Sequence, residues 1–176
     1  MTAPPLVIDS VARPGGGEFG MSHCPGRGAG FGWQRNLTAD LAAIEHWGAT
    51  TLLSLVQDYE YAQLGVPDFA AQVARTRLEW LRVPILDFGT PDAATDAAWQ
   101  AQRGRLRAAL DRGDKVLVHC AAGLGRTGTL VARLLVDAGL DPADAIARVR
   151  RARSGTIQTS AQAEFVRSDR RFTLRG

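Results

Sequence analysis

The feature that most constrains this 176-residue chain is the stretch of residues 116–128. An apolar run is followed by His119, Cys120 and a glycine-bearing loop, and an apolar helical pattern comes next. This order predicts a short buried strand, a tight loop and a helix start. Five residues separate Cys120 from Arg126, enough for one loop whose backbone N–H groups point at a common centre and bind a tetrahedral oxyanion.

The same loop is expected to activate the cysteine. The positive end of the following helix dipole and the guanidinium of Arg126 both favour a thiolate at Cys120. Arg126 offers donors that match two oxygens of a phosphate. The predicted phosphate-binding residues are Ala121, Ala122, Gly123, Leu124, Gly125 and Arg126, with His119 in a supporting role. Thr127 can donate its hydroxyl to the sulfur, which makes the sulfur a better leaving group.

A purely structural interpretation is a buried cysteine beside a glycine turn. It leaves Arg126 and three glycines unexplained. The pattern His119-Cys120-x-x-Gly123-x-x-Arg126-Thr127-Gly128 resembles the signature loop of cysteine-dependent protein tyrosine and dual-specificity phosphatases.

Length and composition indicate one domain over residues 1–176, with an N-terminal extension at 1–18 and a core at 19–170. The 45% hydrophobic and 22% charged content is ordinary for a globular protein. Two cysteines make no disulfide framework, and neither a signal peptide nor a membrane span is recognisable. We therefore expect a reducing, cytoplasmic location.

Basic residues give a formal net charge of +3 and concentrate after Arg103, notably at Arg148, Arg150, Arg151 and Arg153. A solvated helix face is the favoured interpretation, although a basic rim would also steer anionic substrates. The arginines do not alternate with aromatic residues, so nucleic acid is not an expected partner.

Apolar spacing and breakers predict the elements in order. A hairpin-like start involves residues 6–8 and 19–21; helices are expected at 36–47, 58–64, 68–77, 92–112, 126–138 and 142–153, and strands at 50–56, 78–85 and 115–118. Because strands alternate with helices after residue 36, the chain is expected to form an α/β fold.

Residues 24–32 contain too many glycines for regular structure and form a predicted loop. A substrate-facing role is possible, but the lysine of a nucleotide-binding loop is missing. Cys24 is interpreted mainly as a packed thiol; a reversible disulfide with Cys120 is the alternative. His23 beside Cys24 lacks the further ligands of a zinc site, so no metal is expected.

A second piece of chemistry lies at residues 83–92. Thr90 is predicted to cap a helix, with Pro91 at its first position and Asp92 in its first turn. Asp87 would then stay free on the loop and deliver a proton to the leaving oxygen of a phosphate ester. A turn-capping role is the alternative for Asp87, and Asp92 is the competing candidate for the acid.

A third block covers residues 154–166. A phosphorylated cysteine must be attacked by water, and a side-chain amide can orient that water. Gln158 is the candidate and Gln162 the second choice. The alternative is that Thr159 or Ser160 caps a helix while Gln158 lies on the surface.

Over roughly residues 19–166 the chain is similar to dual-specificity phosphatases of the kinase-associated (cyclin-dependent kinase inhibitor 3) type. The markers are residues 22–26, residues 35–37, Pro84-Ile85-x-Asp87-x-Gly89-Thr90-Pro91-Asp92, the Cys120 loop and Gly155-x-Ile157-Gln158-Thr159. The resemblance implies a mostly parallel central sheet flanked by helices. It also implies that Cys120 is the nucleophile, Arg126 the phosphate clamp, Thr127 the leaving-group aid and Asp87 the general acid.

The leading hypothesis is hydrolysis of phosphotyrosine, with phosphoserine and phosphothreonine as additional substrates, in proteins or small phosphomonoesters through a thiophosphate intermediate and without a cofactor. A lipid or small-molecule phosphatase is the enzymatic alternative. An inactive phosphopeptide-binding module is the alternative of another class, and a sulfur transferase is disfavoured because it needs no acid. Oligomeric state stays open.

Overall fold

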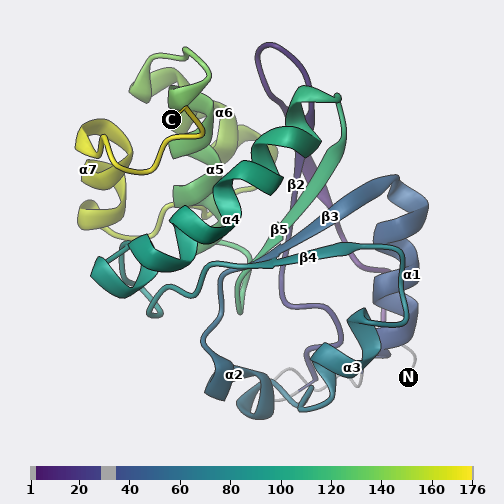
Figure 1. The fold of residues 1–176 in the computed structure, drawn as a ribbon. Helices are drawn as coiled ribbons and strands as arrows, with labels where there is room; N and C mark the ends of the chain where they lie inside the picture. Colours follow the sequence, from purple (N-terminus) through teal and green to yellow (C-terminus); the bar gives the residue numbers. More distant parts are fainter. Residues whose placement is uncertain (1–2, 29–34, 176) are drawn as a thin grey trace.

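The computed structural model describes residues 3–28 and 35–175. Its centre is a five-stranded sheet in the order β1-β2-β5-β3-β4 (Figure 1). The strands are β1 (Asp9–Ala12), β2 (Glu18–Ser22), β3 (Ala49–Ser54), β4 (Glu79–Arg82) and β5 (Lys115–His119). β1 pairs with β2 in antiparallel orientation and the other pairs are parallel. The expected α/β fold with a mostly parallel sheet is confirmed.

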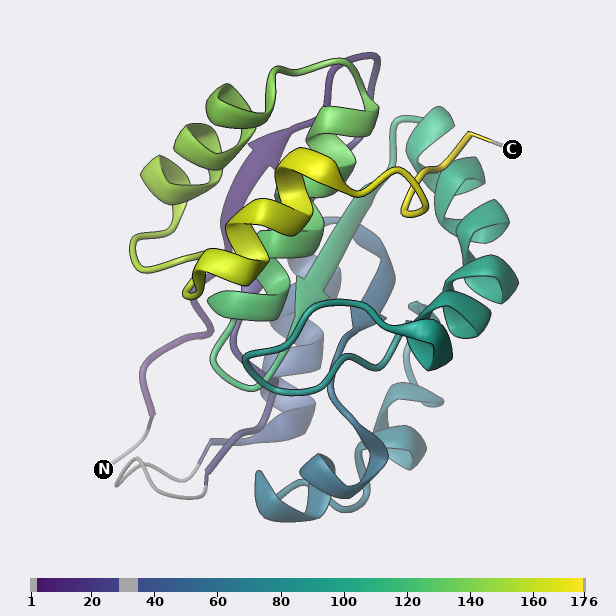
Figure 2. The ribbon, with the colours of Figure 1, turned by 90° about the vertical axis from the view of Figure 1, so that its left-hand side faces the viewer.

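Helices lie on both sides of this sheet (Figures 1 and 2). They are α1 (Leu37–Trp47), α2 (Asp58–Gln63), α3 (Phe69–Val73), α4 (Ala93–Asp111), α5 (Gly125–Asp137), α6 (Pro142–Ala152) and α7 (Ser160–Ser168). α5 packs on β2 and β5 and is itself covered by α6 and α7, whereas α1 packs on β3. α2 and α3 lie below the sheet in the view of Figure 1, with α3 beside α1.

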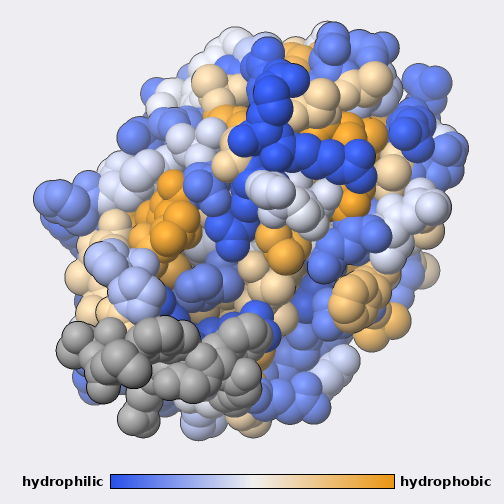
Figure 3. Space-filling view, turned by 180° about the vertical axis from the view of Figure 1, so that it is seen from behind, coloured by the Kyte–Doolittle hydropathy of each residue, from blue (hydrophilic) through white to orange (hydrophobic). Residues whose placement is uncertain are grey.

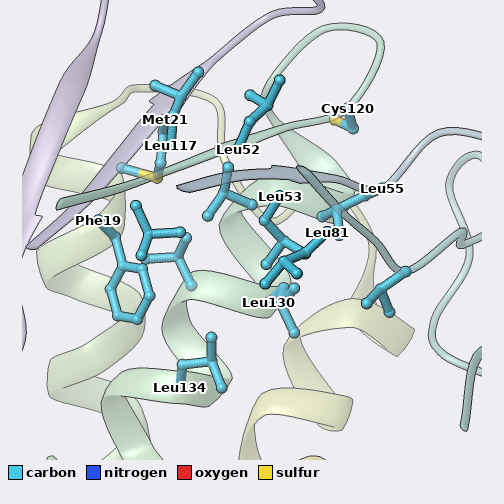
Figure 4. Close-up of a cluster of buried hydrophobic side chains, with 14 of the residues drawn as sticks. Phe19, Met21, Leu52, Leu53, Leu55, Leu81, Leu117, Cys120, Leu130 and Leu134 are labelled. Atoms are coloured by element: carbon cyan, nitrogen blue, oxygen red, sulfur yellow. The ribbon is translucent and has the colours of Figure 1, made fainter. Parts of the chain in front are cut away.

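The hydrophobic core lies between the sheet and these helices, and β5 runs through its middle. Leu117 is fully buried and stands opposite Leu52 of β3, and Cys120 directly follows the same strand (Figure 4). In the sheet register His119 stands opposite Ser22 on β2 and Ser54 on β3. The carboxyl ends of three parallel strands therefore meet at one edge, where ligands bind in open α/β sheets.

Most of the predicted elements are present within a few residues of their expected bounds, with two instructive differences. β1 lies inside the expected N-terminal extension, so that segment contributes a strand, which begins directly after the predicted apolar run at residues 6–8. Asp92, not Thr90, is the N-cap of α4, because its side chain accepts a hydrogen bond from the Thr95 N–H at 2.9 Å.

The surface is mixed in character. In the view of Figure 3, hydrophilic residues cover most of the surface and hydrophobic residues form small separate patches. None of the helices in the described ranges combines the length and apolar character needed to cross a membrane. Of the predicted glycine-rich loop at 24–32, residues 29–32 lie outside the described residues.

Candidate active site

The loop after β5 turns its carbonyl groups outward. Three successive carbonyls, those of residues 121–123, accept hydrogen bonds from the surrounding structure. Arg27 Nη1 donates to the first at 2.7 Å, and the Cys24 N–H donates to the same oxygen at 3.2 Å. Arg153 donates to the second at 3.2 Å and to the third at 2.7 Å. These contacts fix the orientation of three consecutive peptide groups.

Outward carbonyls direct the following N–H groups inward, because the two groups of a trans peptide point in opposite directions. The N–H groups of residues 122–124 thus face the Cys120 side of the loop. Gly123 N donates to Cys120 Sγ at 3.2 Å. In the part of the chain that the structure describes, the N–H groups of Ala122 and Leu124 have no protein acceptor. The loop thus turns these N–H groups toward the sulfur of Cys120, which is only 3% exposed, and its binding of an oxyanion stays a prediction.

The glycine in this loop is required by close packing. Gly123 has a φ of +71°, which disfavours other residues, and a Cβ there would overlap the carbonyl of Ser22 and lie 2.6 Å from His23 N. The loop consequently rests directly on the main chain that follows β2.

Arg126 is held by a carboxylate that the sequence did not reveal. Its Nη1 and Nη2 donate to the two carboxylate oxygens of Glu60 at 2.7 and 2.9 Å, and Nη1 also donates to the Ile85 carbonyl at 3.0 Å. Glu60 is itself fixed, because it accepts from the Gln57 N–H at 2.7 Å at the start of α2. Both charged side chains are more than nine-tenths buried.

Arg126 has one further buried donor and a second carboxylate partner. Its Nε is buried and has no partner among the described residues, and Nη2 forms an ion pair with Asp87 Oδ1 at 3.0 Å. Burial alone would lower the pKa of Arg126, but the hydrogen bond to Glu60 and the charges of Cys120, Glu60 and Asp87 raise it above its ordinary value. A permanently charged donor edge beside a sulfur nucleophile suits a phosphate group.

Asp87 lies on an exposed turn. Gly89 N donates to the Leu86 carbonyl at 2.9 Å, which closes the turn, and Phe88 N donates to Asp87 Oδ1 at 3.0 Å. Phe88 has a φ of +56°. The Asp87 carboxylate thus pairs with Arg126 and also caps its own turn, as the alternative interpretation expected, and its role as general acid stays a prediction. Asp92 is occupied as the cap of α4.

His119 ends a chain of hydrogen bonds that leads to the main chain of Cys120. Trp80 Nε1 donates to Ser54 Oγ at 2.8 Å, Ser54 Oγ lies 2.6 Å from His119 Nε2, and His119 Nδ1 lies 3.3 Å from the Cys120 carbonyl. Because the carbonyl only accepts, Nδ1 carries the proton and the Ser54 hydroxyl donates to Nε2. Burial lowers the pKa of His119 to about 4, so the ring is neutral.

Two other predicted residues lie at or beside the start of α5. The Thr127 hydroxyl is buried and has no hydrogen-bond partner within the described residues, the sulfur included. Gln158 is exposed, and a Cβ placed on Gly125 would lie 2.5 Å from its Oε1. Gln162 is fully buried and caps α7 together with Thr159.

A solvated helix face was the favoured interpretation of the basic residues 148–153, but only part of this segment fits it. Arg148 and Arg151 are exposed. Arg153 instead donates to the carbonyls of residues 122 and 123 and pairs with Asp9 at 2.8 Å. Arg150 donates to the carbonyls of residues 156 and 157 at 3.2 and 3.0 Å. The loops recruit these long side chains because their carbonyls need donors.

Cys24 is a free, fully buried thiol, as its interpretation as a packed residue requires. Its Sγ lies 3.7 Å from the Pro25 carbonyl. Burial, with a smaller contribution from the charge of Cys120, raises the pKa of Cys24 far above its ordinary value.

Comparison with known proteins agrees with this geometry. A family model described as PTP-SAK, Swiss Army Knife protein, DSP-PTPase phosphatase domain, matches residues 24–166. Cyclin-dependent kinase inhibitor 3 of Mus musculus is 28% identical over 135 residues, which cover 76% of this chain and 63% of that protein. Protein tyrosine phosphatase type IVA 3 of Bos taurus is 30% identical over 124 residues, covering 70% and 66%. The chain thus spans less than two thirds of these relatives.

Solved structures show the same fold. A crystal structure of kinase associated phosphatase, with its catalytic-site cysteine replaced by serine, has a TM-score of 0.81, 26% identity and 93% coverage of both chains. Tk-PTP in its active form has a TM-score of 0.63 and 27% identity, covering 85% of this chain and 87% of that one. Together with the loop geometry, these matches confirm the resemblance inferred from the sequence. The chain belongs to the family of dual-specificity and protein tyrosine phosphatases.

Proposed function

We propose that this protein hydrolyses phosphomonoesters, with phosphotyrosine in proteins as the leading substrate and phosphoserine or phosphothreonine as further ones. The proposal is supported by the hydrogen bond from Gly123 N to the Cys120 sulfur, by the inward N–H groups beside it, and by Arg126, whose charge interacts with Cys120 and whose Nε has no partner among the described residues. A thiolate and an anion clamp in one loop can bind an ester and attack it.

In the first step the Cys120 thiolate attacks phosphorus and a sulfur–phosphorus bond forms. The bond from phosphorus to the ester oxygen breaks, and the departing oxygen takes the proton of Asp87. Arg126 and the loop amides stabilise the charge on the other phosphate oxygens. A free alcohol or phenol leaves, and Cys120 carries the phosphoryl group.

In the second step water attacks phosphorus and gives a proton to the Asp87 carboxylate. The sulfur–phosphorus bond breaks, inorganic phosphate is released and the thiolate returns. We assign Gln158 to orienting this water, because its amide lies beside Gly125 at the start of α5. We assign Thr127 to stabilising the returning thiolate, because its buried hydroxyl follows Arg126 directly and has no partner among the described residues.

The substrate class is inferred from the side chains of the loop that follows Cys120, which carry no charge before Arg126. Lysines inside such a loop would favour highly charged inositol phosphates, and the positions in question hold Ala121, Ala122 and Leu124. This favours protein substrates over lipid headgroups. A cytoplasmic, reducing location is part of the proposal, because oxidation of Cys120 would remove the nucleophile.

The test is a substrate panel. The protein should hydrolyse an aryl phosphate and phosphotyrosine peptides, vanadate should inhibit it, and mixing on the millisecond scale should release one equivalent of phenol in a burst if the second step is slower. Preferred hydrolysis of phosphoinositides would move the assignment to lipids. Tight phosphopeptide binding without turnover would indicate a binding module.

A further inference from the structure

Gln162 connects the start of α7 to the turn that carries the general acid. Its side chain is fully buried. Its Oε1 accepts hydrogen bonds from the N–H groups of Gln158 at 2.9 Å and Thr159 at 3.2 Å. Its Nε2 donates to the Gly89 carbonyl at 3.2 Å. The two ends of one amide therefore face two different segments of the chain.

The Gly89 carbonyl belongs to the turn that presents Asp87. Gly89 closes this turn through its hydrogen bond to Leu86, and Asp87 and Phe88 occupy the two central positions. The side chains of Leu86 and Phe88 are 54% and 60% exposed, so core packing does not hold the turn. Besides the ion pair between Asp87 and Arg126, contacts to the main chain are therefore needed to fix its orientation.

Two side chains supply such contacts through hydrogen bonds, one on each side of Asp87. Arg126 donates to Ile85, the residue just before the turn, and Gln162 donates to Gly89, the residue that ends it. Within the described residues no other side chain donates to a main-chain atom of residues 86–89. The acid thus lies between a contact to the phosphate clamp and a contact to α7.

We infer that Gln162 is a positioning residue for the general acid, and this inference rests on the proposed function. Its hydrogen bond to Gly89 holds Asp87 where the leaving oxygen will be. Loss of this bond lets the turn move, and proton transfer suffers more than phosphate binding. The water-orienting role is left to Gln158, since Gln162 already uses both its oxygen and its nitrogen within the protein.

Gln162→Glu is the variant that separates this role from helix capping. The carboxylate retains an oxygen that can accept from the N–H groups of residues 158 and 159, but it has no N–H for Gly89. The readout is kcat/KM for two aryl phosphates, one with a poor and one with a good leaving group, because only the poor leaving group needs the acid. We expect a loss of roughly tenfold for the poor leaving group and little for the good one. A general effect of the new charge on phosphate binding would lower both equally.

Thr159→Val is the matched control. The Thr159 hydroxyl accepts from Gln162 N at 3.0 Å and does not contact the acid turn. This variant should lower Tm through the weakened cap and leave the ratio of the two rates unchanged. If Gln162→Glu lowers Tm while also leaving the ratio unchanged, the residue is only structural and the inference is overturned.

A double-variant cycle separates this inference from the proposed function. Once Asp87→Asn has removed the acid, adding Gln162→Glu should cost nothing further for the poor leaving group. An additive loss would contradict positioning through Asp87. If Asp87→Asn alone does not change the leaving-group dependence, the acid assignment itself fails, and with it the proposed mechanism.

Discussion

The loop of residues 120–126, called here the phosphate loop, and the turn of residues 86–89, called the acid turn, meet at Arg126 but are held in different ways. In the phosphate loop three consecutive carbonyls are bound by surrounding donors, and Gly123 packs directly on the main chain after β2. In the acid turn Leu86 and Phe88 are largely exposed, Asp87 pairs with Arg126, and among the described residues side chains donate to the main chain only at the flanking residues Ile85 and Gly89. Charge stabilisation requires fixed dipoles, whereas an acid that gives and takes a proton can lie on a lightly held segment.

The two ion pairs of Arg126, with Asp87 in the acid turn and with Glu60, also differ in how firmly they are held. Asp87 is about half exposed, so its ion pair with Arg126 contributes little to the stability of the fold. The ion pair of Arg126 with Glu60 is buried, and breaking it would leave a buried charge without a partner and destabilise the fold strongly. An arriving phosphate dianion should therefore displace Asp87 from the Nη2 edge and leave Glu60 in place. The displaced carboxyl is then next to the ester oxygen.

The largest expected effect comes from the rigid region. Cys120→Ser removes the thiolate but retains the loop amides and Arg126, so turnover should fall by roughly 10⁴-fold or more while vanadate or phosphate still binds. Steady-state kinetics and isothermal titration measure the two properties separately. Substantial remaining turnover would remove Cys120 from its role.

The buried carboxylate behind Arg126 gives the next effect. Glu60→Gln leaves a buried guanidinium without its counter-charge, so the free energy of unfolding should fall by about 3 kcal/mol and vanadate should bind more weakly. Denaturant unfolding and inhibition constants provide the measurements. Glu79→Gln is the control, since Glu79 pairs with Arg105 on the surface and should cost about 1 kcal/mol or less. Equal losses in the two variants would contradict the clamp.

The acid turn should respond more weakly. Asp87→Ala removes the proton donor without disturbing the loop, so kcat should fall roughly 10²-fold for a poor leaving group while phosphate binding is retained. Asp92→Asn, at the cap of α4, is the comparison: it should retain kcat. If instead the Asp92 variant loses the leaving-group dependence, the acid must be reassigned.

The sequence revealed the parts of the site that are local in the chain. Cys120, its loop and Arg126 lie within seven consecutive positions, and strand, loop and helix patterns surround them. Asp87 was found because a capped helix start limits the loop that carries it, although the cap proved to be Asp92. Asp92 is preferred because a helix that begins at Ala93 brings Thr95 within 3.0 Å of the Pro84 carbonyl.

The residues that escaped prediction act across long sequence separations. Glu60 lies 66 positions from Arg126, and Ser54 lies 65 positions from His119. The pattern Gln57-x-x-Glu60 indicates a helix start and gives no sign of a buried arginine. The sequence pattern predicts Arg153 only as the last residue of an exposed helix. The fold places it next to the carbonyls of residues 122 and 123, which lie about 30 positions away in the chain.

The smallest expected effect concerns pH and the support behind the nucleophile. The pKa of His119 is lowered to about 4 by burial, while an unfolded histidine titrates near 6.5. Between these values the unfolded state binds more protons, so stability is present above pH 6.5 and is lost as the pH falls toward 4. From pH 6.5 to 5 the loss should reach about 2 kcal/mol. Urea unfolding at several pH values should therefore show that the free energy of unfolding depends less steeply on pH for His119→Asn than for the wild type.

His46→Gln, at the exposed end of α1, is the control and should retain the steep dependence of the wild type. If both variants behave alike, the hydrogen bonds from Trp80 through Ser54 do not hold a neutral imidazole behind Cys120.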